Sequence, residues 1–159
     1  MKIKSSKSFL LAILILPWLT IPLLGKEAFK KYLPAAIFIC TFTKAIDIFG
    51  ENKRWWQFYK GIPPFNSMNF FNFGPYFVTS LWMLKMTYGN FLVYLIANFL
   101  LHVLFIFQGG IKFVTYYKIF SLVNLSKLQY LGIDFLRAVL LYGFQYLTDL
   151  SHAEKTIDA

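Results

Sequence analysis

Residues 8–25, SFLLAILILPWLTIPLLG, form an apolar run without a single charged side chain. A transmembrane helix needs about 20 mainly apolar residues, with a range of about 17–25. The run therefore predicts a membrane span. Pro17 and Pro22 predict kinks, which membrane helices tolerate when neighbouring groups satisfy the freed carbonyls. The basic start MKIKSSK resembles a signal peptide, but the run ends before Lys26 without a small-residue cleavage site, so we expect the span to be retained.

The composition of the whole chain agrees with this start. Of the 159 residues, 58% are hydrophobic and 14% are charged, whereas soluble domains are about 45–50% apolar and about 25% charged. A soluble fold of this size leaves too much surface exposed to hide so much apolar material. The net charge of +9 comes mainly from lysines that lie between the apolar runs. This pattern predicts contacts with anionic lipid on the inner face of a bilayer and argues against nucleic acid as a partner.

Four further apolar runs follow the first, and glycines and prolines separate them. With 8–25 they predict an all-α bundle of about five transmembrane helices in a single domain over 1–159, the other spans being 33–49, 73–88, 90–108 and 131–147. The short link between the third and fourth spans predicts a tight antiparallel hairpin, and Gly109-Gly110 predicts the end of the fourth. In the fifth span, Asp134 and Arg137 would cost about 2.5–3.5 kcal/mol each at the bilayer centre. They lie near its start, where pairing and snorkelling lower that cost.

Two segments outside these spans are rich in aromatic residues. Residues 111–125, IKFVTYYKIFSLVNL, predict a helix in the plane of the membrane interface, and the alternative is an extension of the fourth span that leaves the membrane. Residues 65–77, FNSMNFFNFGPYF, predict an interfacial loop with an aromatic belt, and the alternative is the lining of a binding cavity.

The distribution of cations predicts the orientation in a cell membrane. With the N-terminus cytoplasmic, nine cations fall inside and five outside, so the inner side is the more positive and the C-terminus is external. Lys53 and Arg54 beside Trp55 and Trp56 are the candidate contacts to lipid headgroups of the inner leaflet. The inner cations are Lys2, Lys4, Lys7, Lys53, Arg54, Lys60, Lys112, Lys118 and Lys127, and the outer ones are Lys26, Lys30, Lys31, Lys85 and Lys155.

Five ionisable side chains are predicted to lie at membrane depth, where such groups are costly and mark functional candidates. Lys44 and Asp47 are three residues apart and can pair on one helix face, as can Asp134 and Arg137, and His102 lies in the fourth span. The alternating directions of the spans place all five in the cytoplasmic half. We therefore expect a polar cluster between the second, fourth and fifth spans. Interhelical packing pairs, an ion or proton path, and a lipid-headgroup or ligand pocket all remain open as its purpose.

No catalytic, metal or cofactor site is expected from the sequence. The lone Cys40 has no histidine in register, and Ser80 and Thr79 have no base at similar depth. A sequence without catalytic or cofactor-binding motifs predicts a non-enzymatic accessory, scaffold or assembly subunit. Such a subunit would bind a protein partner or a second copy of this chain. The alternative is a small oligomeric transporter or channel with the polar cluster on its path. A lipid-modifying enzyme would need a dyad, for which His102 with Asp134 is the candidate.

Several short motifs between Leu33 and Leu147 carry a family resemblance. They are Leu33-Pro34-Ala35-Ala36-Ile37-Phe38, Lys53-Arg54-Trp55-Trp56, Phe73-Gly74-Pro75, Trp82 to Lys85, Thr87-Tyr88-Gly89-Asn90-Phe91 and Leu141-Tyr142-Gly143-Phe144-Gln145-Tyr146. In these the chain resembles a group of short, uncharacterised multi-pass membrane proteins of Bacillus-like Firmicutes. The group has no assigned activity, so the resemblance implies a bacterial membrane protein and supplies no functional residues.

Overall fold

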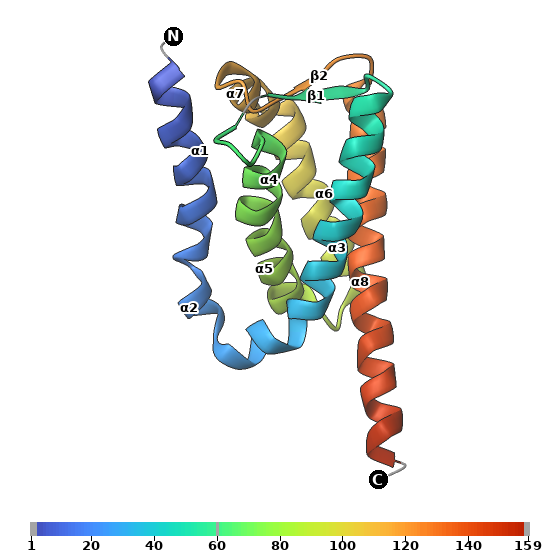
Figure 1. The fold of residues 1–159 in the computed structure, drawn as a ribbon. Coiled ribbons are helices and arrows are strands. Elements are labelled where there is room, and N and C mark those ends of the chain that lie inside the picture. The colour runs from blue at the N-terminus through green and yellow to red at the C-terminus, as the bar shows by residue number, and fades with distance from the viewer. Residues whose placement is uncertain (1–2, 60, 158–159) are drawn as a thin grey trace.

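Helices account for most of the chain, as the computed structural model shows for residues 3–59 and 61–157, with side chains from Lys7 onward (Figure 1). The predicted all-α class is therefore confirmed in outline. The helices are α1 (Ile3–Trp18), α2 (Ile21–Leu24), α3 (Lys26–Asn52), α4 (Ser67–Phe71), the π-helix η1 (Asn72–Tyr76), α5 (Phe77–Thr87), α6 (Phe91–Phe107), α7 (Gly110–Tyr116) and α8 (Lys127–Ile157). Lys2 and Lys60 of the predicted inner cations lie outside the described residues.

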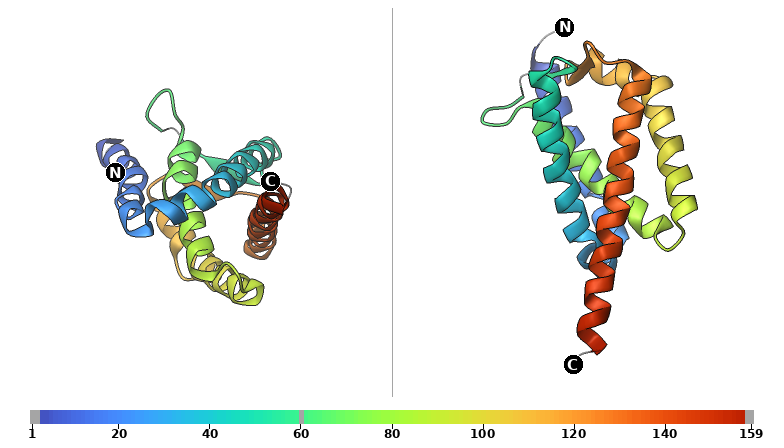
Figure 2. Two further views of the ribbon diagram at one scale, coloured as in Figure 1. Left: turned by 90° about the horizontal axis from the view of Figure 1, so that it is seen from below. Right: turned by 90° about the vertical axis from the view of Figure 1, so that its right-hand side faces the viewer.

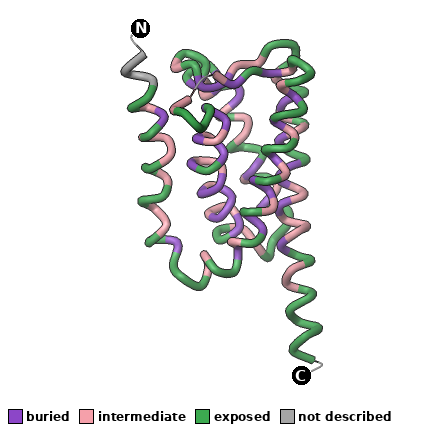
Figure 3. Tube along the Cα trace, viewed as in Figure 1, coloured by how far each residue is buried: buried purple, intermediate pink, exposed green. Residues whose placement is uncertain are grey.

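Four of the helical segments form a ring. Helix α3 packs against the η1–α5 segment, α5 packs against α6, α6 packs against α8, and α8 packs against α3. The helix α1 packs outside this ring, against α4, η1 and α5, and Figure 2 shows it set apart on one side. A Cβ on Gly74 would meet the Ile13 carbonyl oxygen at 2.5 Å, so only a glycine allows α1 to approach η1 this closely. Burial follows this division, because buried residues concentrate in the ring (Figure 3).

One end of the ring is closed by a short two-stranded sheet. Strand β1 (Trp56–Phe58) pairs antiparallel with β2 (Phe120–Leu122), with Gln57 opposite Ser121. We call this the sheet end, and the first described residues of α1 lie there, whereas α8 ends at the opposite end (Figure 1). The predicted interfacial helix 111–125 is therefore wrong beyond Tyr116. The backbone N–H and C=O groups of residues 120–122 pair with β1 instead of continuing a helix.

The number of spans that meet a length and hydropathy test is lower than the predicted five. Among the described residues, two helical segments, Lys7–Leu24 and Lys26–Asn52, are long and apolar enough to cross a membrane, and α6 with α7 is a third if their 47° bend belongs to one span. The predicted span 73–88 corresponds to α5, which has 11 residues because η1 separates it from α4. In the predicted span 131–147, α8 is long enough, but Asp134 and Arg137 lower its mean hydropathy.

The hairpin and the glycine stop follow the sequence prediction. Helix α5 ends at Thr87 and α6 begins at Phe91, with the Asn90 side chain accepting a hydrogen bond from the Val93 backbone N–H at 3.1 Å. Such an N-cap satisfies one of the free N–H groups of the first turn. Helix α6 ends at Phe107, and Gly109 adopts a φ of 118°. This conformation favours glycine and allows the bend into α7.

Two apolar clusters fill the interior. The first lies toward the end of the ring opposite the sheet and includes Ala35, Ile39, Leu81, Tyr94 and Leu141. The second lies at the sheet end and contains many aromatic side chains, among them Trp56, Phe120 and Tyr130. Between the levels of these two clusters, each segment of the ring has at least one buried polar side chain, for example Asp47 on α3 and Asn98 on α6.

Candidate functional site

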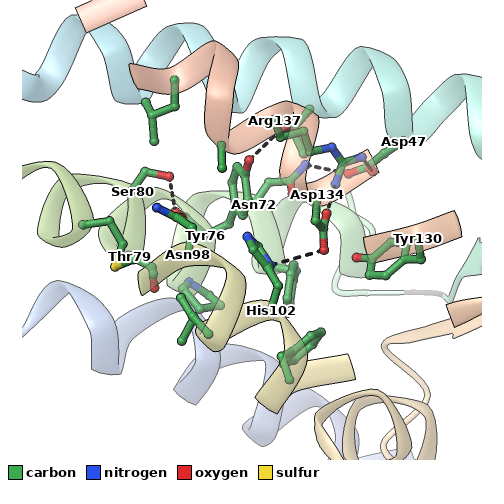
Figure 4. Close-up of a pocket in the computed structure, with 18 of the residues that line it drawn as sticks. Asp47, Asn72, Tyr76, Thr79, Ser80, Asn98, His102, Tyr130, Asp134 and Arg137 are labelled. Atoms are coloured by element: carbon green, nitrogen blue, oxygen red, sulfur yellow. Dashed lines mark hydrogen bonds and ion pairs between the residues drawn. The ribbon is translucent and has the colours of Figure 1, made fainter. Parts of the chain in front are cut away.

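A layer of five polar side chains separates the two apolar clusters. It consists of Asp47 from α3, Asn72 from η1, His102 from α6, and Asp134 and Arg137 from α8, and we call it the polar layer (Figure 4). Four of the five are at most 6% exposed, and the His102 side chain is 16% exposed. All four sides of the ring thus contribute to one polar layer.

Arg137 joins the two carboxylates of the polar layer. Its Nη2 donates to Asp47 Oδ1 on the neighbouring helix α3 at 2.8 Å, and its Nη1 donates to Asp134 Oδ1 at 3.1 Å along α8. Charge-assisted bonds of this kind are shorter and stronger than neutral ones. Because the three groups are buried, removal of Arg137 would leave two uncompensated carboxylates in a medium of low dielectric constant.

Further contacts fix the two carboxylates in place. Asn72 Nδ2 donates to Asp47 Oδ2 at 3.2 Å, and His102 Nδ1 lies 3.4 Å from Asp134 Oδ2. The indole Nε1 of Trp56 donates to the Asp47 carbonyl oxygen at 3.1 Å, and the Arg137 guanidinium carbon lies 5.9 Å from the centre of the Trp56 ring. Arg137 Nε has no hydrogen-bond partner among the described residues.

The π-helix η1 explains how Asn72 reaches the polar layer. A π-turn adds one residue to the helical turn and therefore rotates the side chains that precede it relative to those that follow. Asn72 bonds to Asp47, while Tyr76 Oη accepts from Thr43 Oγ1 at 3.2 Å, so both ends of η1 face α3. Pro75 lies inside this turn and donates no backbone hydrogen bond, which favours such an irregular turn.

A cavity of about 190 Å³ lies beside the polar layer, in the centre of the ring. It is bordered by residues of α3, α4, η1, α5, α6, α8 and both strands, and its lining is mainly apolar. The polar layer contributes Asp47, Asn72, His102, Asp134 and Arg137 to one side of it. On another side lie Thr79, Ser80 and Asn98 (Figure 4). The site is therefore a largely apolar space with charged groups on one wall, as is typical of small-molecule sites.

The structure brings together four of the five residues in the predicted cluster and leaves Lys44 out. Lys44 is exposed on the outer side of α3, whereas Asp47 is 3% exposed and bonds to Arg137 and Asn72. The expected local pair of Lys44 and Asp47 is therefore wrong. The two side chains are three residues apart, but α3 turns only Asp47 toward the ring.

For one of the four expected headgroup contacts, Trp56, the prediction is wrong. Trp56 is 1% exposed and packs in the sheet-end cluster, because strand β1 turns it inward to the backbone of Asp47. Lys53 and Arg54 are exposed and Trp55 is half-buried, so these three lie at the surface of the sheet end.

The expected aromatic loop over 65–77 is also wrong in its structure. Most of these residues form α4 and η1, where Asn66 caps α4. The buried Ser67 hydroxyl lies 2.7 Å from the carbonyl oxygens of Tyr59 and Ile119 and can donate to one of them at a time. Phe71 and Tyr76 of this stretch line the cavity, which was the alternative interpretation of the segment.

The nucleophilic side chains of Cys40 and Ser80 are both engaged in hydrogen bonds to backbone carbonyl groups. Cys40 is buried and its Sγ contacts the Asn72 carbonyl oxygen at 3.5 Å, and Ser80 Oγ donates to the Tyr76 carbonyl oxygen at 2.8 Å. His102 and Asp134, the only candidate dyad, do lie side by side. Within residues 3–59 and 61–157, no group of three or more His, Cys, Asp or Glu side chains is arranged to hold a metal ion.

Sequence reasoning missed Asn72, Tyr76, Thr43 and Tyr130 as lining residues. One signal was available, because Asn72 and Pro75 interrupt an aromatic-rich run that otherwise has few polar side chains. The chain matches no protein-family model, no curated protein and no solved structure.

Proposed function

We propose that the protein crosses the cell membrane five times, with its N-terminus in the cytoplasm and its C-terminus outside. The α4–η1–α5 segment has 21 consecutive helical residues, and at about 1.5 Å per residue it approaches the roughly 30 Å of a hydrocarbon core. Helix α6 has 17 residues of high hydropathy, and α8 buries Asp134 and Arg137, the two charges of its predicted span 131–147, inside the ring. Of the predicted inner cations, those at Lys7, Lys53, Lys112 and Lys127 belong to elements at the sheet end, in keeping with the positive-inside rule.

Labelling of single introduced cysteines in whole cells with a membrane-impermeant maleimide tests this topology. The native Cys40 is buried and gives a low background. We expect Lys155→Cys to react in intact cells, and Lys53→Cys to react only after the membrane is permeabilised. Reaction of both cysteines in intact cells would contradict the five-span topology, because in that topology an odd number of spans separates position 53 from position 155.

We infer further that the protein is a non-enzymatic binding protein of the transporter class, which holds a small amphiphilic molecule in its central cavity. The observation that carries this proposal is the cavity of about 190 Å³ with charged groups on one wall only. Costly ionisable groups inside a membrane protein usually face a path or a ligand. A purely structural ion pair needs no adjoining space, whereas a molecule with one polar and one apolar end would fit the two kinds of wall.

Two neighbouring leucines of α6 provide a matched test. Leu101 lines the cavity and is 38% exposed, whereas Leu100 is 55% exposed and is not part of the cavity lining. The tagged wild type and each tryptophan variant are purified in mild detergent and weighed by native mass spectrometry. We expect the wild type and Leu100→Trp to retain a bound small molecule and Leu101→Trp to lose it. Equal retention by both variants would contradict binding in this cavity.

An accessory or assembly subunit is the second candidate, and the placement of α1 favours it. This helix contacts the ring on one side only, and Leu11, Ile15 and Leu16 on it are exposed. The last part of α8, from residue 151 to 157, is exposed as well. The same mass spectrum decides between the two candidates, because a stoichiometric second protein with an empty cavity would favour the accessory role.

A further inference from the structure

The charges of the polar layer do not balance. Asp47 and Asp134 each bring one negative charge and Arg137 brings one positive charge, so the layer carries a net charge of −1 when His102 is neutral. Lys44, the nearest cation along α3, is exposed and faces away from the ring. An unbalanced charge is costly when it is buried away from water. The layer therefore favours one additional positive charge in the adjoining space.

The other walls of the cavity suit an organic cation. Six aromatic rings line it, and aromatic faces attract cations through their quadrupole. They are Phe58, Phe71, Tyr76, Phe105, Phe120 and Tyr130. Aromatic rings beside a carboxylate such as Asp134 are the combination that recognises ammonium groups attached to apolar bodies.

The volume of the cavity limits the size of the ligand. An apolar protein cavity of about 150 Å³ accepts benzene, and the cavity here measures about 190 Å³. A single aromatic ring with a short aminoalkyl arm therefore fits, and a full lipid does not.

We propose that the ligand of this cavity is a small organic cation, such as an arylalkylamine, whose ammonium group lies against Asp134 while its apolar body lies among the aromatic rings. This inference rests on the proposed binding function and specifies the chemical class of the ligand. A proton on His102 would neutralise the layer in the same way. The ligand and that proton would therefore compete for one role, and variants of His102 separate them.

The test is isothermal titration of the purified full-length protein with 2-phenylethylamine and with its neutral analogue 2-phenylethanol. Leu101→Trp is the blank that corrects for partition into detergent. We expect the wild type to bind the amine at least about tenfold more tightly than the alcohol, as the cost of the unbalanced buried charge implies. We expect His102→Lys, which places a fixed cation in the layer, to lose this preference, and His102→Gln to keep it.

Asp134→Asn should also lose the preference for the amine, and His102→Lys answers the same question if that variant does not fold. Equal binding of alcohol and amine to the wild type would overturn the cationic ligand and leave the binding function standing. Retention of the amine preference in His102→Lys would overturn it as well. Failure of both probes to bind would overturn the cationic proposal, while the small molecule retained in native mass spectrometry would still decide the binding function independently.

Discussion

The polar layer and the apolar cluster next to it fill the same four-helix ring by different means. The layer joins the helices through directional bonds between charged and amide groups, and a cavity adjoins it. The apolar cluster joins the same helices through close packing of small and aliphatic side chains such as Ala35, Ile39 and Leu81, all of them fully buried. Four helices can thus be held by packing at one level and by charge at the next.

The difference matters because the two levels respond differently to a bilayer. Lipid tails are as apolar as leucine, so burial of aliphatic side chains between membrane helices gains packing but little hydrophobic free energy. A charge in the same position has no acceptable alternative in lipid. We therefore expect the polar layer to be the more sensitive of the two levels to substitution.

The largest effect is expected from Arg137→Leu, because it leaves two buried carboxylates unpaired. Breaking a buried ion pair on one side costs about 3–5 kcal/mol. Unfolding in mixed detergent, followed by tryptophan fluorescence, measures the loss, and Trp56 beside Arg137 is one of the four tryptophans that contribute to the signal. Lys44→Leu is the control, since it also removes a cation but from the exposed side of α3, and a change within about 0.5 kcal/mol is expected. Similar losses in both variants would contradict the special role of the layer.

A smaller effect is expected from Leu81→Ala in the apolar cluster. Leu81 is fully buried in α5, and the substitution leaves a cavity that the packed ring fills only in part. Because lipid offers the unfolded helix an apolar surrounding, the loss should lie near the lower end of the usual range, about 2 kcal/mol. Leu92→Ala, at a position 66% exposed on α6, should leave the same unfolding curve unchanged. A loss for Leu81→Ala larger than that for Arg137→Leu would reverse the comparison.

The helices that carry the apolar cluster could largely be predicted from the sequence. Apolar runs separated by Gly and Pro gave the helices, and Asn90 and Gly109 marked ends that the structure also has. The convergence of residues at the polar level followed from direction alone, because alternating helices bring residues at one depth together. The structure places Asp47, His102, Asp134 and Arg137 at that common level.

What the sequence did not reveal depends on rotation about a helix axis or on short-range pairing. Lys44 and Asp47 are three residues apart, yet the buried face of α3 includes Asp47 and excludes Lys44, and only packing against the neighbouring helices decides this. Asn72 faces the layer because of a π-turn, which a regular period of 3.6 residues cannot anticipate. The pairing of β1 with β2 joins two strands of three residues across more than sixty positions, and so short a run gives no alternating pattern.

The smallest effect is expected from Thr43→Val, which removes one neutral hydrogen bond and keeps the shape of the side chain. Thr43 is 1% exposed, and its hydroxyl donates to Tyr76 Oη at 3.2 Å, from α3 to η1. Interhelical hydrogen bonds in membrane proteins are worth about 0.6 kcal/mol on average, so a loss of that order should appear in the unfolding curve. Thr41→Val is the control, because the exposed Thr41 bonds only to the Ile37 carbonyl oxygen of its own helix at 2.9 Å. A loss for Thr43→Val near that for Arg137→Leu would mean that hydrogen bonds in general, and not charge, make this level sensitive.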